Sequence, residues 1–271
     1  MKVTVRDQNH GCRYFYSMRN IFLILLTLLP FTKLFAQIDS TKKVSILLIP
    51  YSPEYYLSDA EKDILDASAI SQSELHEAFR KTLDLKLSAE LETLGSCKSM
   101  LSDTSRSGKM KLGRYYYSTG YSYQEPVGKR VARESELPKA KKKNSGGSSQ
   151  HTAPQSITTR GDSKYMRATP SDTIVLKQLR SSTASDYIVS INQFEIKTNY
   201  NTCLDIANKI YRREVIVHYS VFDANGKEVL GNYAVAFFPS NTNRYGDIVE
   251  RCFPEIAREI TTNIKSQTGK K

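Results

Sequence analysis

The chain has 271 residues and carries 39 lysines and arginines against 28 aspartates and glutamates, a formal net charge of +11. Its apolar runs are shorter than the roughly 18 to 20 residues that a membrane-spanning helix needs, so the sequence excludes a protein with several transmembrane helices. A charge of this size suggests nucleic acid or anionic lipid as a partner, and the choice between them depends on where the charge lies.

The charge is unevenly distributed along the chain. Residues 1–36 carry a net charge of +4, residues 37–97 carry −5, residues 98–170 carry +10 and residues 171–271 carry +2. The positive excess therefore belongs to the N-terminus and to one internal segment. The other two parts are together mildly acidic.

The N-terminus predicts export. An apolar run at 21–31 (IFLILLTLLPF) follows two arginines and is itself followed by the small residue Ala36, the pattern of a cleaved secretory signal peptide over 1–36. Met18 is an alternative start of translation, and an uncleaved inner-membrane anchor through 21–36 is the alternative to cleavage. We expect the mature chain in the periplasm or at the periphery of the outer membrane, where nucleic acid is not a partner.

Three cysteines remain after the signal: Cys97, Cys203 and Cys252. No C-x-x-C pair or histidine lies in metal-ligand spacing with them, so we expect no metal site and no cofactor. One disulfide with one free thiol and three free thiols that pack as small apolar side chains are both compatible with this count.

The segment 98–170 differs in composition from its flanks. It contains 12 serines and 7 glycines, but only 9 residues of the types Val, Ile, Leu, Met and Phe. We therefore expect a long, disordered, low-complexity insert, least ordered over 126–170. Its tyrosine-rich part, 112–124, either forms a short strand or packs on the domain surface.

Four lysines of this insert form the candidate binding site: Lys139, Lys141, Lys142 and Lys143. Clustered lysines attract lipid headgroups, lipopolysaccharide or acidic polysaccharide through diffuse, salt-sensitive electrostatics. The alternative is that the insert is only a tolerated surface loop, because long loops add little closure entropy.

The residues before the insert predict a strand and two helices. An apolar run at 43–50 (KVSILLIP) is typical of a buried strand. Ser58 with Glu61, and Ser71 with Glu74, both fit the capping box that begins a helix. After the second box, leucine and phenylalanine recur every three or four residues up to Gly95, which predicts a helix of about two dozen residues.

The residues after the insert predict a helix, three strands and a final helix. The alternation over 186–197 slips by one residue, which indicates a β-bulge near Asn192. Asn225 and Gly226 join two apolar runs, a strong β-hairpin signal. The C-terminal helix begins near Tyr245, and Pro254 either kinks it or begins a second helical segment.

The element order predicts an α/β (α+β-like) domain assembled from 37–97 and 171–267, followed by a short tail at 268–271. We expect one small mixed sheet of about four strands with helices mainly on one face.

This order, with the phrase ASDYIV at 184–189 where a strand follows a helix, resembles small α/β domains of the bacterial envelope. These are the N-terminal domain of the Tol-system propeller protein, the periplasmic domain of the curli secretion channel and the lipoprotein activators of penicillin-binding proteins. The segment YYLSDAE at 55–61 is also similar to exported bacterial proteins of unassigned function. The resemblance implies a non-catalytic adaptor that binds another envelope protein. Unlike those domains, this chain lacks a lipobox and carries the long basic insert.

Catalytic motifs are missing from the sequence: it has no GxSxG, HExxH, Walker or GxGxxG pattern, so we assign no catalytic residue. His76 and His218 fall on a predicted helix and strand, and His151 falls in the insert. The acidic residues Asp59, Glu61, Asp63 and Asp66 lack the spacing of a calcium loop and indicate a solvated helix face. We expect an exported, non-catalytic adaptor; an exported hydrolase, its site assembled from distant residues, is the alternative.

Overall fold

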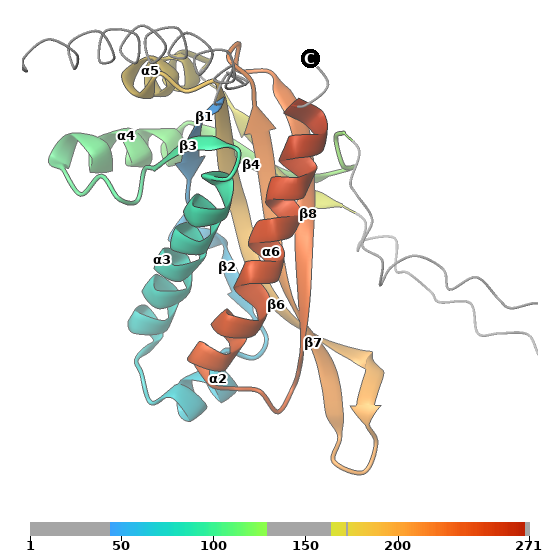
Figure 1. Cartoon of the computed structure of the whole chain (residues 1–271). Coiled ribbons are helices and arrows are strands. Elements are labelled where there is room, and N and C mark those ends of the chain that lie inside the picture. The colour runs from blue at the N-terminus through green and yellow to red at the C-terminus, as the bar shows by residue number, and fades with distance from the viewer. Residues whose placement is uncertain (1–43, 129–163, 172, 269–271) are drawn as a thin grey trace, which may run out of the picture. The chain divides into compact units, whose positions relative to one another are not determined.

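Two long helices lie side by side against one face of a mixed β-sheet (Figure 1). The structure is a computed structural model that describes residues 44–128, 164–171 and 173–268, all within the compact unit 43–271. The two helices are α3 (Gln72–Leu91) and α6 (Tyr245–Thr268). They contact each other, and α6 also contacts strand β8 (Glu228–Pro239). No helix of the described residues has the length and hydropathy to cross a membrane.

The main sheet has six strands, so the expectation of about four strands is wrong. Its order is β3-β1-β6-β7-β8, and β2 pairs with the middle of β6, beyond the part that pairs with β1. The strands β1, β2, β3 and β6 pair in parallel, whereas β6, β7 and β8 pair antiparallel. The bounds not yet given are β1 (Val44–Ile49), β2 (Tyr56–Ser58), β3 (Gly95–Ser99), β6 (Tyr187–Asp205) and β7 (Ile210–Phe222).

The two strands that the sequence did not predict are short and poor in apolar residues. The sequence of β3 is GSCKS, and it lies at an edge of the sheet, where a strand needs no apolar alternation. Gly95 begins it because a Cβ atom there would lie 1.8 Å from the carbonyl oxygen of Val44. Glycine therefore permits the close approach of β3 to β1.

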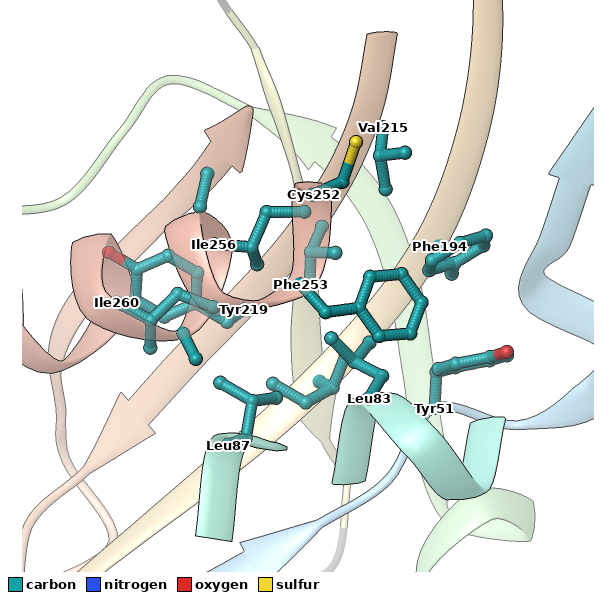
Figure 2. Close-up of a cluster of buried hydrophobic side chains, with 14 of the residues drawn as sticks. Tyr51, Leu83, Leu87, Phe194, Val215, Tyr219, Cys252, Phe253, Ile256 and Ile260 are labelled. Atoms are coloured by element: carbon teal, nitrogen blue, oxygen red, sulfur yellow. The ribbon is translucent and has the colours of Figure 1, made fainter. Parts of the chain in front are cut away.

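The face of the sheet that packs against α3 and α6, here called the helical face, buries aliphatic and aromatic side chains (Figure 2). The predicted stripe of α3 forms half of this core, and α6 supplies the other half. The ring of Phe253 lies 5.9 Å from the rings of both Phe79 and Phe194, measured between centroids. The helix α6 is continuous through Pro254, so no second segment begins there.

The two predicted capping boxes have different outcomes. The box at Ser71 is confirmed: the Ser71 hydroxyl accepts from the Glu74 N–H, and the Glu74 carboxylate accepts from the Ser71 N–H at 2.8 Å. The box at Ser58 is wrong. Ser58 ends β2, and the helix α2 (Glu61–Ser68) begins after Ala60 without a side-chain cap. A one-turn 3-10 helix, η2 (Pro53–Tyr55), precedes β2.

The opposite face of the sheet, here called the mixed face, is also covered, so the expectation of helices mainly on one face holds only for the two longest ones. It packs against α4 (Arg106–Tyr117), α5 (Thr173–Thr183) and a second, two-stranded sheet. That sheet pairs β4 (Thr119–Gln124) with β5 (Tyr165–Pro170) in antiparallel register, and β5 contacts β6, β7 and β8.

Both ends of the predicted low-complexity insert are therefore folded. They contain α4, β4 and β5, and their tyrosines provide the apolar area that aliphatic residues usually provide: Tyr115 and Tyr165 are fully buried. The small number of Val, Ile, Leu, Met and Phe residues in the segment therefore understates the apolar area that it buries. The central part of the insert, 129–163, lies outside the described residues.

The two local backbone signals after the insert are confirmed. The pairing register of β6 with β7 shifts between Ile191 and Gln193, as a bulge at Asn192 requires. Gly226 adopts φ +77° in the turn between β7 and β8, where the N–H of Asp223 donates to the carbonyl of Lys227.

Candidate functional site

The predicted binding lysines Lys139, Lys141, Lys142 and Lys143 lie outside the described residues. The structure therefore neither groups them nor separates them. The candidate sites lie in the folded part of the chain, and the sequence predicted none of them as a site.

The three cysteines are free thiols in the structure. Burial raises the pKa of Cys97 and of Cys252 to about 12, so both stay protonated and unreactive near neutral pH. Cys203 is exposed. Of the two alternatives left by the sequence, the structure contains three thiols rather than a disulfide.

The acidic group near α2 has a structural role, which corrects the expectation of a simple solvated face. The backbone N–H and the hydroxyl of Thr198 donate to the Asp59 carboxylate at 2.7 and 2.9 Å. The buried Arg213 guanidinium donates to Asp63 at 2.6 Å. These bonds fix β2 and α2 to the β6–β7 pair, and no acidic, cysteine or histidine side chains within the described ranges form a metal-binding group.

Neither described histidine forms part of a hydrolytic arrangement. Nε2 of His76 contacts the Glu61 carboxylate, and its ring packs on Tyr56. Nδ1 of His218 accepts from the Met166 N–H at 2.9 Å. No serine or cysteine side chain is hydrogen-bonded to either ring in the described part of the chain, so the hydrolase alternative gains no support from these residues.

His218 belongs to a buried polar layer between the main sheet and the β4–β5 sheet. It lies beside Asn192 and Gln193, which are 0% and 1% exposed. The Asn192 amide donates to the Met166 carbonyl and to Ser220, while Gln193 accepts from the Tyr123 hydroxyl. Burial lowers the pKa of His218 to about 4, so the ring is neutral at physiological pH. This layer fixes β4–β5 in place.

A β-hairpin extends past the rest of the sheet. We call residues 199–211 the hairpin arm: β2 stops pairing with β6 at Ile196, and β8 stops pairing with β7 at Arg212 (Figure 1). Three large apolar side chains of the arm are solvent-exposed, Tyr200 at 69%, Leu204 at 53% and Ile206 at 85%. Cys203 lies on the same arm. These residues have no role in the core, so they form a candidate contact surface.

A cleft of about 530 Å³ lies beside the edge strand β3. Its lining includes Asp84 and Ser88 of α3, Cys97 of β3 and Leu179 of α5. The Ser99 hydroxyl donates to the Asp84 carboxylate at 2.8 Å, and burial raises the pKa of Asp84 to about 6. The polar part of its lining consists of carboxylates, hydroxyls and lysines.

Known proteins share little sequence or structural similarity with this chain. No family model and no curated protein matches the sequence. Among solved structures, the chain is similar to two PelC dodecamers from Paraburkholderia phytofirmans, one of them a point variant. The variant is 8% identical, with a TM-score of 0.32 over 80% of this chain and 88% of that chain. The other is 6% identical, with a TM-score of 0.30 over 80% and 86%. TM-scores this low support no inference about the fold or the function of this chain.

Proposed function

We propose that this chain is an exported, non-catalytic adaptor of the cell envelope that docks another envelope protein through the hairpin arm. One observation carries the proposal: Tyr200, Leu204 and Ile206 are exposed on an arm that extends beyond both neighbouring strands. Exposed apolar side chains grouped on one projecting element are typical of a protein interface. The signal-like N-terminus supports export.

The thiol of Cys203 provides a site-specific test. It is exposed, whereas Cys252 is buried and the Cys97 pKa is raised by burial, so maleimide–benzophenone at neutral pH labels Cys203 selectively. Labelled protein is added to envelope membranes and irradiated. We expect one discrete adduct with an envelope protein, and loss of most of that adduct when Tyr200→Ser and Ile206→Ser are combined.

The matched control moves the label away from the arm. In a Cys203→Ser variant that carries Ser73→Cys on α3, the label is on an exposed helical residue, and we expect no such adduct. Adducts of equal yield from both positions, or an adduct that persists after the double arm substitution, contradict docking through the arm.

The proposal also assigns an anionic surface, such as lipid headgroups or acidic polysaccharide, to Lys139, Lys141, Lys142 and Lys143. The charge of 98–170 supports this part, because that segment carries +10. Binding to vesicles that contain phosphatidylglycerol tests it: we expect changing the four lysines to glutamine to weaken binding at least tenfold. Equal binding by the variant contradicts it, and leaves docking through the arm unaffected.

A further inference from the structure

The cleft beside β3 lies at an unpaired edge of the main sheet. β3 is the terminal strand and pairs with β1. The Met100 N–H donates to the Leu48 carbonyl of β1 at 2.9 Å. Because alternate residues of a strand direct their backbone groups to opposite sides, Cys97 directs its N–H and C=O away from β1. Within the described ranges neither group has a hydrogen-bond partner, so this edge offers a donor and an acceptor to another strand.

The walls of the cleft come from helices on opposite faces of the sheet. Asp84 and Ser88 belong to α3, which packs on the helical face, whereas Leu179 and Thr183 belong to α5, which packs on the mixed face. The edge strand lies between these walls. A chain that contacts both walls must therefore continue the plane of the sheet, which an extended strand does.

The two walls differ in chemistry. On the α3 side the cleft presents the carboxylates of Asp84 and Glu92, both close enough to Cys97 to affect its thiol. On the α5 side it presents the buried side chains of Leu179 and Met100. Lys98 of β3 and, beside the mixed-face helix α4, Lys111 and Asp103 also line the cleft, and Lys111 is close enough to Asp103 to help lower its pKa. A basic side chain thus complements the first wall, and a small apolar one complements the second.

We propose that β3 and its cleft bind an extended peptide segment of a partner protein by strand addition. Basic side chains of the segment face Asp84 and Glu92, and its apolar side chains face Leu179 and Met100. The cleft is separated from β6 by β1, which pairs with the end of β6 that begins at Tyr187, whereas the hairpin arm is at the other end of β6. The two contacts are therefore independent, and either one can fail without the other.

A synthetic strand tests the proposal directly. The peptide acetyl-Gly-Val-Lys-Val-Lys-Val-Gly-amide is titrated into the purified protein, and backbone amide chemical shifts are followed by NMR. We expect saturable shifts confined to 95–99 and to the facing residues of α3 and α5, with a Kd of about 10 to 100 μM. The same peptide N-methylated at alternate amides should bind at least tenfold more weakly, because it cannot complete the strand pairing.

Two further comparisons test the charge pattern. A peptide with glutamate in place of lysine should bind at least tenfold more weakly, and Asp84→Asn, nearly isosteric, should weaken the lysine peptide by about tenfold. Glu90→Gln, on the same helix but outside the cleft, should leave the affinity unchanged. Far-UV circular dichroism confirms that both variants are folded.

Several outcomes overturn the proposal. Equal binding of the N-methylated peptide excludes strand addition, and equal binding to the Asp84→Asn variant excludes the assigned wall. Shifts located elsewhere, or none at millimolar peptide, exclude the cleft. A concentration-dependent dimer that protects the amides of 95–99 makes a second copy of this chain the occupant instead.

Discussion

The two faces of the main sheet bury their side chains in different ways. The helical face is covered by α3 and α6 and packs aliphatic and aromatic groups such as Leu83, Phe194 and Phe253. The mixed face is covered by short helices and by β4–β5, and at its centre it buries Asn192 and His218 in place of apolar groups. One sheet thus has a largely apolar interior on one side, and on the other side an apolar cluster next to a hydrogen-bonded layer.

Because of this difference, the two faces make different contributions: one mainly to the stability of the fold, the other to a unique arrangement of its parts. Apolar burial stabilises a fold roughly in proportion to area, whatever the detailed pairing. The buried polar layer acts through specific bonds: Gln193 bonds to Tyr123 of β4, and His218 and Asn192 bond to Met166 of β5, so these bonds fix one arrangement of β4–β5 over the sheet. We expect most of the free energy of folding to come from the helical face, and the position of the tyrosine-rich segment to depend on the mixed face.

The largest expected effect tests this division with one substitution on each face. Phe253→Ala on the helical face should lower the free energy of unfolding by about 3 to 5 kcal/mol, because it leaves a cavity among fixed rings. Phe222→Ala, at the end of β7 on the mixed face, should lower the free energy of unfolding by less, because fewer buried residues surround Phe222. Urea denaturation followed by circular dichroism measures both. An equal or larger loss for Phe222→Ala breaks the comparison.

His218 on the mixed face and Asp84 on the helical face are buried groups whose pKa values shift in opposite senses, so they should affect stability oppositely as the pH falls. The pKa of His218 is lowered from 6.5 to about 4, so the unfolded chain binds more protons between these values, and acidification destabilises the fold. From pH 6.5 to pH 4 this amounts to about 3 kcal/mol. His218→Asn retains an acceptor for the Met166 N–H and should remove this loss, as the difference between wild-type and variant unfolding free energies at each pH shows.

The control for this titration is the same measurement above pH 7. There the imidazole is neutral in both states, so the difference between the wild type and His218→Asn should be constant. A difference that keeps changing above pH 7, or that is flat from pH 6.5 to pH 4, means that burial of His218 is not the cause.

Asp84 should give the opposite slope. Burial raises its pKa from 3.8 to about 6, so the folded chain binds more protons between these values, and acidification stabilises the fold by about 3 kcal/mol. The Asp84→Asn variant lacks this stabilisation on acidification, so its free energy of unfolding should fall more steeply from pH 6 to pH 4 than that of the wild type. If the two curves run parallel over this range, Asp84 is not buried in its charged form.

The helical face could be predicted from the sequence because its physics is local and periodic. The leucine stripe of α3 and the Ser71 cap each depend on neighbours a few residues away, as does the Asn225–Gly226 turn outside this face. The short strands β2 and β3 could not be predicted, because long-range pairing with β6 and β1 defines them. The Ser58 motif was misleading for the same reason: pairing with β6 overrides its capping preference.

The candidate contacts on the folded part were harder to predict than the fold. The apolar residues of the hairpin arm are typical of an ordinary extension of a strand. Nothing in the sequence shows that β2 and β8 stop pairing with β6 and β7 before the arm begins. The cleft joins Asp84, Cys97 and Leu179, which are far apart in the chain. One signal was present: Tyr115 and its neighbouring tyrosines indicated that part of the insert is folded.

The smallest expected effect tests whether loss of the Ser71 cap destabilises only the start of α3 and leaves β4–β5 unaffected. Ser71→Ala removes the hydroxyl that accepts from the Glu74 N–H and should lower the free energy of unfolding by about 1 kcal/mol. Lys86→Ala, at an exposed position farther along the same helix, should change it by less than about 0.5 kcal/mol. Amide hydrogen exchange should increase at the N-terminus of α3 in the first variant, while the amides of β4 and β5 keep their protection relative to global unfolding. Faster local exchange in β4–β5 would show that the two faces are coupled, because the cap lies on the helical face and contacts neither strand.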